Sequence, residues 1–298
     1  MIQNVLTLNP VKKAVYQHDP YFAAALGAAL GAWADERSLS AFLWSHTSLL
    51  LRPEAILARR SRAIFPILRA HGLIPVSIRR IRITPQQAGL LWRYQSNVMT
   101  PGHFLLLQRL LCAGPSIYIV LRDYSQRRST PAAGHVTYLK GPTLMSRRKP
   151  LHLRSLAGPA IANILSYIHV SDDPADFLRE LAILFSGKIL VEILLQAAAG
   201  KDHTGDGLAM LQAAELYAPK IALAGAGTAC WNEEHLVSSF EDLPLRREWA
   251  EILTRARTNI SYVGGEVYDT RAALIPDDKR YLAPLDSHLI RLDIGPGF

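Results

Sequence analysis

The sequence His169-Val-Ser-Asp-Asp-Pro-Ala-Asp-Phe-Leu-Arg-Glu180-Leu-Ala-Ile-Leu-Phe185 places a histidine at the end of an apolar run, directly before a helix start. Aspartate followed by proline begins this helix, because aspartate caps the first free N–H groups and proline fits the first turn. Glu180 follows on the helix, from where its carboxylate could reach back and orient the imidazole ring. A neutral histidine is nucleophilic near pH 7, so the pattern indicates phosphoryl transfer through a phosphohistidine.

Just upstream, Lys149-Pro-Leu-His-Leu-Arg154 supplies a guanidinium that can hold phosphate in two hydrogen bonds. Plainer interpretations remain open. A histidine at a strand end is more often a hydrogen-bonded core residue, and Arg154 could be a surface ion-pair partner. Ser171, Asp172 and the residues after them also make an ordinary helix start.

Composition restricts the class of protein. The chain has 298 residues, of which 49% are hydrophobic and 19% charged, as in a globular protein. Its apolar runs are too short or too interrupted to span a membrane, and the N-terminus lacks signal-peptide features, so we expect a cytoplasmic protein. Cys112 and Cys230 have neither disulfide nor metal spacing. The net charge of +8 comes from arginine clusters that favour a solvated basic face, and nucleic acid is an unlikely partner.

The periodicity predicts an α/β protein in which helices cover an antiparallel or mixed sheet. The expected strands are 47–51, 74–83 and 116–121. The expected helices begin at Pro20, at Pro53, at Thr84-Pro85 and near His103. A loop region rich in glycine, proline and arginine should then lead to the His169 segment and a long helix.

Five landmarks in this order resemble the nucleoside diphosphate kinase family. Leu50-Leu-Arg-Pro-Glu54 is similar to the family's I-K-P-D, and Ala113-Gly-Pro115 to its S-G-P before an apolar strand. Leu139-Lys-Gly-Pro-Thr143 lies where the family has L-G-x-T-x-P, and Lys149 to Arg154 matches the stretch that ends in its R-G arginine. The His169 segment is similar to H-G-S-D-S with a glutamate eleven positions after the histidine. The resemblance covers about residues 46–186.

The resemblance implies a ferredoxin-like βαββαβ fold with three parts: an N-terminal helical extension (1–45), the family-like domain (46–186) and a C-terminal, mostly helical extension (187–298). It also implies ATP and Mg²⁺, a nucleotide or other small-molecule acceptor, and a homodimer. No protein metal ligand is implied. The implied site residues are His169 and Glu180 for catalysis, Arg52, Arg154 and Thr143 for phosphate, Tyr94, His103, Phe104 and Leu107 for the base, with Ser166 beside them, and Ser171 and Asp172 as support.

The chain also departs from the family pattern. Val170 replaces the glycine after the histidine and adds bulk there, Arg52 replaces a lysine, and Ser166 replaces an asparagine unless Asn163 takes that role. Arg154 is fifteen positions before His169, slightly more than in the family. A divergent phosphotransferase with another acceptor is therefore the leading hypothesis. A non-catalytic nucleotide-binding protein and a nucleotidyl transferase remain alternatives.

The last third of the chain is not explained by the resemblance. The segments 189–199 and 208–217, the second within an expected helix at 206–217, are apolar enough to need a packing partner. We expect them to pack on the core and to shape the acceptor side. A helix at 245–257 and a broken strand at 260–268 are also expected. Cys230-Trp-Asn-Glu-Glu-His-Leu-Val237 faintly resembles the family's W-F-x-P-E-E-L-V.

Overall fold

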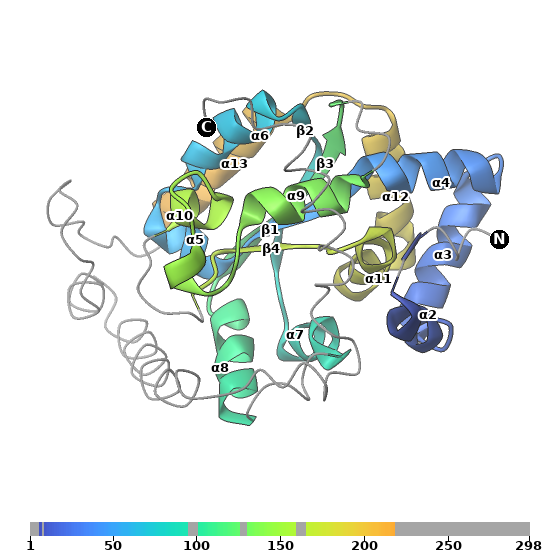
Figure 1. Ribbon diagram of the computed structural model, residues 1–298, viewed down its shortest axis with the longest axis horizontal. Helices are drawn as coiled ribbons and strands as arrows, with labels where there is room; N and C mark the ends of the chain where they lie inside the picture. Colours follow the sequence, from blue (N-terminus) through green and yellow to red (C-terminus); the bar gives the residue numbers. More distant parts are fainter. Residues whose placement is uncertain (1–5, 8, 95–100, 126–129, 159–164, 218–298) are drawn as a thin grey trace, which may run out of the picture.

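A computed structural model describes residues 6, 7, 9–94, 101–125, 130–158 and 165–217. Its described part contains a four-stranded antiparallel sheet in the order β2-β3-β1-β4, with β1 at His46–Leu51, β2 at Leu73–Arg82, β3 at Pro115–Asp123 and β4 at Ile168–Val170. The two central strands are β1 and β3. With helices after β1 and β3, this order is the expected ferredoxin-like βαββαβ topology (Figure 1).

The central strands are apolar because both faces of the sheet are covered. All six residues of β1 are buried. Leu49 and Leu51 belong to the core cluster on one face, whereas Leu50 belongs to the cluster on the other. The edge strand β2 begins apolar and ends in exposed and half-exposed arginines, as a partly solvated edge allows.

The connection from β1 to β2 differs from the single expected helix. It consists of α5 (Pro53–Ala58), the 3-10 turn η1 (Ser61–Ala63) and α6 (Ile64–Ala70). Arg59 ends α5 in the left-handed conformation, with φ of 53°, and its guanidinium donates to the carbonyl of Glu215 at 2.9 Å. The contact with Glu215 thus accompanies the end of α5 at Arg59, a helix end that local helix propensity does not predict. Gly72, with φ of 73°, makes the turn into β2.

The two expected helices are present in the described part of the connection between β2 and β3. They are α7 (Pro85–Leu91) and α8 (Pro101–Cys112). Thr84 and Gln87 form a complete capping box at the start of α7, which explains why this helix could be predicted locally.

The expectation of a loop region after β3 is wrong for residues 132–140, which form the helix α9 (Ala132–Lys140) on the sheet. The sequence pattern hides this helix because a buried polar residue interrupts its apolar face. His135 is fully buried, and its Nδ1 lies 2.7 Å from Oδ2 of Asp123 at the end of β3. A short turn η3 (Met145–Arg147) and the helix α10 (Leu153–Ala157) follow before β4.

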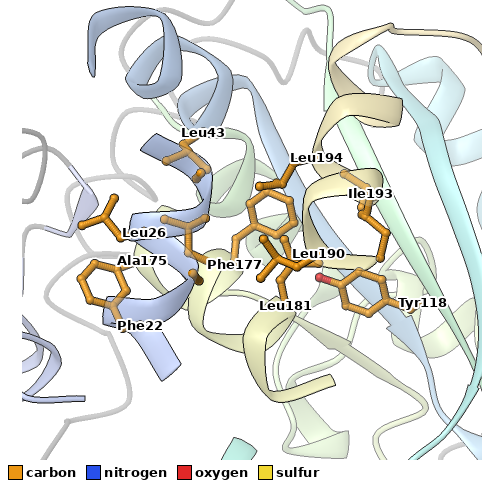
Figure 2. Close-up of a cluster of buried hydrophobic side chains, with 14 of the residues drawn as sticks. Phe22, Leu26, Leu43, Tyr118, Ala175, Phe177, Leu181, Leu190, Ile193 and Leu194 are labelled. Atoms are coloured by element: carbon orange, nitrogen blue, oxygen red, sulfur yellow. The ribbon is translucent and has the colours of Figure 1, made fainter. Parts of the chain in front are cut away.

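Helices from both ends of the described chain complete the layers. The N-terminal helices are α2 (Pro10–Tyr16), α3 (Pro20–Ala32) and α4 (Glu36–Ser45), and those after β4 are α11 (Pro174–Leu184), α12 (Gly187–Ala198) and α13 (Thr204–Tyr217). Figure 2 shows the core in which α3, α11 and α12 meet the sheet through Phe22, Phe177, Leu190 and Tyr118. On the other face of the sheet, α13 contributes Leu211 and Ala214 to the cluster that contains Leu49 and Leu51.

The expected apolar segments 189–199 and 208–217 thus lie largely in α12 and α13, both packed on the core. The expected helix at 245–257, the strand at 260–268 and the motif beginning at Cys230 lie outside the described residues. Within the described part of the chain, no helix combines the length and apolar character needed to cross a membrane.

Candidate functional site

The centre of the candidate site is a hydrogen bond between His169 and Glu180. His169 lies on β4 opposite Leu50 of β1, and Glu180 lies on the helix α11 that follows. The distance from Nε2 of His169 to Oε1 of Glu180 is 2.7 Å. A carboxylate only accepts hydrogen bonds when ionised, so Nε2 carries the proton and Nδ1 of the neutral ring keeps its lone pair. The His169 side chain is 23% exposed, whereas that of Glu180 is 9% exposed.

Glu180 is held by two further side chains. Oε2 accepts from the hydroxyl of Ser171 at 2.6 Å and from that of Ser48, on β1, at 3.2 Å. Burial raises the pKa of Glu180, but the charge and hydrogen bonds of His169 and Ser171 outweigh it, so the pKa is lowered overall. The buried carboxylate is therefore an ionised, oriented partner for the ring.

The residues before α11 have both roles that the sequence left open: one starts the helix, and others support the site. Asp173 caps the helix by accepting from the backbone N–H of Asp176 at 2.9 Å, which is the ordinary helix start. Ser171 and Asp172 instead face the site. The carboxylate of Asp172 lies 3.3 Å from Nζ of Lys140 at the end of α9. Burial raises the pKa of Asp172, yet Lys140, Lys12 and His169 lower it overall.

The ring of Trp92 flanks His169 edge-on, with 5.0 Å between the ring centroids. Val170 does not crowd the histidine, contrary to the expectation of bulk beside it. Successive side chains of a strand point to opposite faces, and Val170 is fully buried in the cluster that contains Leu49. The valine thus fills the core on the face of the sheet opposite to His169.

Arg52 is enclosed rather than open to a ligand. It is 2% exposed, its Nε lies 2.8 Å from Oε1 of Glu54, and its Nη1 donates to the hydroxyl of Ser166. Burial is the main cause of a lowered pKa of Arg52 and a raised pKa of Glu54. A phosphate contact by Arg52 would require the Glu54 pair to open. The next residue after Ser166, Tyr167, has φ of 60°, an uncommon conformation for a bulky residue.

Arg154 lies on α10, which packs against β4. It is largely buried, and its Nη1 donates to the carbonyl of Gly141 at 2.7 Å. Arg148 donates to the neighbouring carbonyls of Pro142 and Thr143. Thr143 itself is exposed. Burial, followed by the charges of Lys149, Arg148 and Arg154, lowers the pKa of His152. The loop therefore gathers positive charge, as an anion-binding loop would.

The residues expected to clamp a base have packing partners. The hydroxyl of Tyr94 donates to Oδ2 of Asp19 at 2.6 Å, and the Arg179 guanidinium lies 4.7 Å from its ring centroid. Leu107 is buried and Phe104 half-buried in the cluster that also contains Trp92. His103 lies on α8, and its side chain is outside the described part. These contacts are those of core side chains, and a base-binding role stays a prediction.

Three residues at the site were not singled out from the sequence. Ser48 follows Thr47 in a strand that is otherwise apolar after it, and a hydroxyl next to a buried leucine run is the signal that could have found it. Lys12 and Arg179 carry no comparable local signal, because their partners lie far away in the sequence. Within the described ranges, no group of three histidine, cysteine or acidic residues could hold a metal ion.

Comparisons with known proteins find nucleoside diphosphate kinases. The sequence model of the family described as nucleoside diphosphate kinase matches residues 45–189. Among solved structures, the chain is similar to the nucleoside diphosphate kinase of Aquifex aeolicus, with 24% identity, coverage of 48% of this chain and 96% of that chain, and a TM-score of 0.40. It is also similar to a halophilic nucleoside diphosphate kinase from Halobacterium salinarum in complex with CDP, with 23% identity, coverage of 47% and 87%, and a TM-score of 0.40.

An NDP kinase from Pyrobaculum aerophilum matches at 20% identity over 48% of this chain and 97% of that chain, with a TM-score of 0.38. A search of curated proteins finds no match. The family match spans the sheet, the helices α5 to α11, and both His169 and Glu180. Residues 45–189, just under half of the chain, thus match the model of the nucleoside diphosphate kinase family.

Proposed function

We propose that this protein is a phosphotransferase that moves the γ-phosphate of ATP through His169 to a nucleotide or another small-molecule acceptor. The observation that carries the proposal is the hydrogen bond from His169 to the buried, ionised Glu180. Because this bond holds the proton on Nε2, the free nucleophilic atom is Nδ1. A merely structural histidine does not need a partly exposed ring with a lone pair facing away from its carboxylate.

The reaction has two displacements. In the first, the Nδ1 lone pair attacks the γ-phosphorus, an N–P bond forms, and the bond from phosphorus to the bridging oxygen breaks, so that ADP leaves with its electron pair. The ring becomes positively charged, and Glu180 stabilises this charge through the Nε2–H. In the second, an oxygen of the acceptor attacks the phosphorus and the N–P bond breaks, which returns the neutral ring.

The phosphate groups require cations near the ring. Arg154 and the cationic loop 141–152 lie on the elements next to β4, and Lys140 reaches the site through Asp172. Mg²⁺ would neutralise charge on the phosphates; it commonly keeps few protein ligands, which fits a site with Asp172 as its nearby carboxylate. We assign Arg52 a phosphate contact only once its pair with Glu54 opens.

The acceptor side is where this protein departs from the family pattern. The proposed base-binding residues are Tyr94, His103, Phe104 and Leu107, and Tyr94 is already bonded to Asp19 from outside the family domain. An altered acceptor follows from this, since loops and added segments set substrate choice on a reused fold. The proposed homodimer and cytoplasmic location rest on the family resemblance and the composition.

The buried Arg52–Glu54 pair favours a second candidate, a nucleotide-binding protein without phosphotransfer. Because Glu54 neutralises Arg52, this guanidinium would stabilise the charge on a transferring γ-phosphate less than a free cation would. Both candidates predict nucleotide binding, and they differ in whether a covalent phosphoenzyme forms.

Incubation with γ-labelled and α-labelled ATP separates the candidates. We expect γ-label on the protein in an acid-labile, base-stable form, and none in His169→Ala. His18→Ala, at an exposed histidine, serves as the matched control and should label normally. Binding without label would support the non-catalytic candidate, and α-label in a product would support nucleotidyl transfer. Unchanged γ-labelling in His169→Ala would overturn the assignment of the nucleophile.

A further inference from the structure

Helix α2, which precedes the family domain in the sequence, supplies a buried cation to the helix that carries Glu180. Lys12 is 2% exposed, and its Nζ lies 2.9 Å from Oδ2 of Asp173 and 2.8 Å from Oδ2 of Asp176. Both carboxylates belong to the first turn of α11. The hydroxyl of Tyr16, also on α2, donates to the other oxygen of Asp176 at 2.5 Å.

A second buried contact joins the N-terminal helices to the next turn of α11. Asp19 caps α3, and its Oδ2 accepts from Nε of Arg179 at 2.9 Å. Arg179 also donates through Nη2 to the carbonyl of Leu90 on α7 at 2.9 Å. Arg179 precedes Glu180 directly, and α7 leads to Trp92, which flanks the His169 ring. One guanidinium therefore links Asp19 to both elements beside the histidine.

These contacts constrain the position of α11 because buried charges must be paired. Without Lys12, the carboxylates of Asp173 and Asp176 would stay buried near Asp172, whose own ion pair is with Lys140. The first turn of the helix would then move or admit water. Glu180 lies on the same helix, so a small shift there changes a 2.7 Å hydrogen bond to His169.

We propose that Lys12 and Asp19 are positioning residues of the His169 site, so that residues 10–45 form one working unit with the family domain. The proposal extends the proposed function and rests on it for its kinetic consequence. The groups that face His169 are Glu180 from α11, Asp172 before it, and Trp92 after α7. Lys140 and Lys12 compensate the charge of Asp172 from α9 and α2.

The test is Lys12→Met, which keeps the length of the side chain and removes its charge, with Lys12→Arg as the conservative variant. The matched control is Lys188→Met, at an exposed lysine of α12. In the native protein, NMR should show a low-field proton on Nε2 of His169, protected by Glu180. We expect Lys12→Met to lose this signal, Lys12→Arg to restore it at least in part, and the control to keep it. A lysine that only stabilises the fold would lower the melting temperature and leave the signal in place.

The kinetic readout is the rate of phosphoenzyme formation, which should fall at least about tenfold in Lys12→Met with little change in KM for ATP. Asp19→Asn is a second variant that keeps the helix cap, since asparagine caps as well as aspartate, and we expect the same two effects. If both variants are folded and keep the protected proton, the proposal is wrong. A native protein that forms no phosphoenzyme contradicts the proposed function alone, because the proton signal still reports the positioning.

Discussion

His46 should make the stability of the protein fall steeply in mild acid. It begins β1, is 2% exposed, and its Nδ1 lies 2.7 Å from the carbonyl of Phe42. The ring also stacks on that of Phe42, with centroids 4.0 Å apart. Burial, helped by the charge of Arg122 and opposed by the carbonyls of Phe42 and Ala197, lowers the pKa of His46 from 6.5 to about 4.

The magnitude follows from linkage. A difference of about 2.5 pKa units at about 1.4 kcal/mol each corresponds to a stabilisation of roughly 3 kcal/mol. Because the pKa is lowered in the folded state, the full contribution is present above pH 6.5. As the pH falls from 6.5 towards 4, the unfolded chain binds a proton that the folded chain excludes, so the free energy of unfolding decreases.

Urea unfolding of the native protein and of His46→Asn between pH 7.5 and pH 4 measures this contribution. The asparagine amide can still donate to the carbonyl of Phe42, but it does not titrate. The variant should start less stable because the side chain is smaller, and should lose roughly 3 kcal/mol less over the pH range. Equal losses in the two proteins would refute the reasoning, since the other titrating groups are common to both.

Three further outcomes are expected. Glu180→Gln should slow phosphoenzyme formation by about 10²-fold or more, because the charge that stabilises the phosphorylated ring is lost; a native rate in single-turnover labelling would contradict this. Arg154→Ala should weaken ATP binding by about 1.5–3 kcal/mol in calorimetry, and unchanged binding by the folded variant would exclude the phosphate contact. Gly141→Ala should lower the melting temperature, since φ is 77° and the new Cβ would lie 2.4 Å from the His152 ring. Gly31→Ala, in open space on α3, should raise it slightly, and equal effects would count against the clash.

The elements that were predicted well carry their signals within a few residues. The strand β1 is a short apolar run, α7 has its capping box, and α11 has aspartate and proline at its start. The pairing of His169 with Glu180 was anticipated for the same reason, since a strand and the following helix bring the two residues together over a short loop.

The features that were missed depend on contacts that only the folded chain makes, some of them between distant segments. The helix α9 was not predicted because His135 lies on its buried face, where it is paired with Asp123 at the end of β3. The Lys12 contacts join residues more than 160 positions apart, and periodicity carries no information on such pairs. For Arg52, the resemblance indicated a phosphate ligand, while the fold brings its guanidinium to Glu54 and Ser166.

The central claim, that His169 receives phosphate on the nitrogen that Glu180 leaves free, has one direct test. The protein is labelled with ATP, digested under alkaline conditions, and the phosphohistidine isomer is identified by mass spectrometry and ³¹P NMR. The account predicts phosphate on Nδ1 of His169, because Nε2 donates its proton to Glu180. Phosphate on Nε2, or on any residue other than His169, would contradict it.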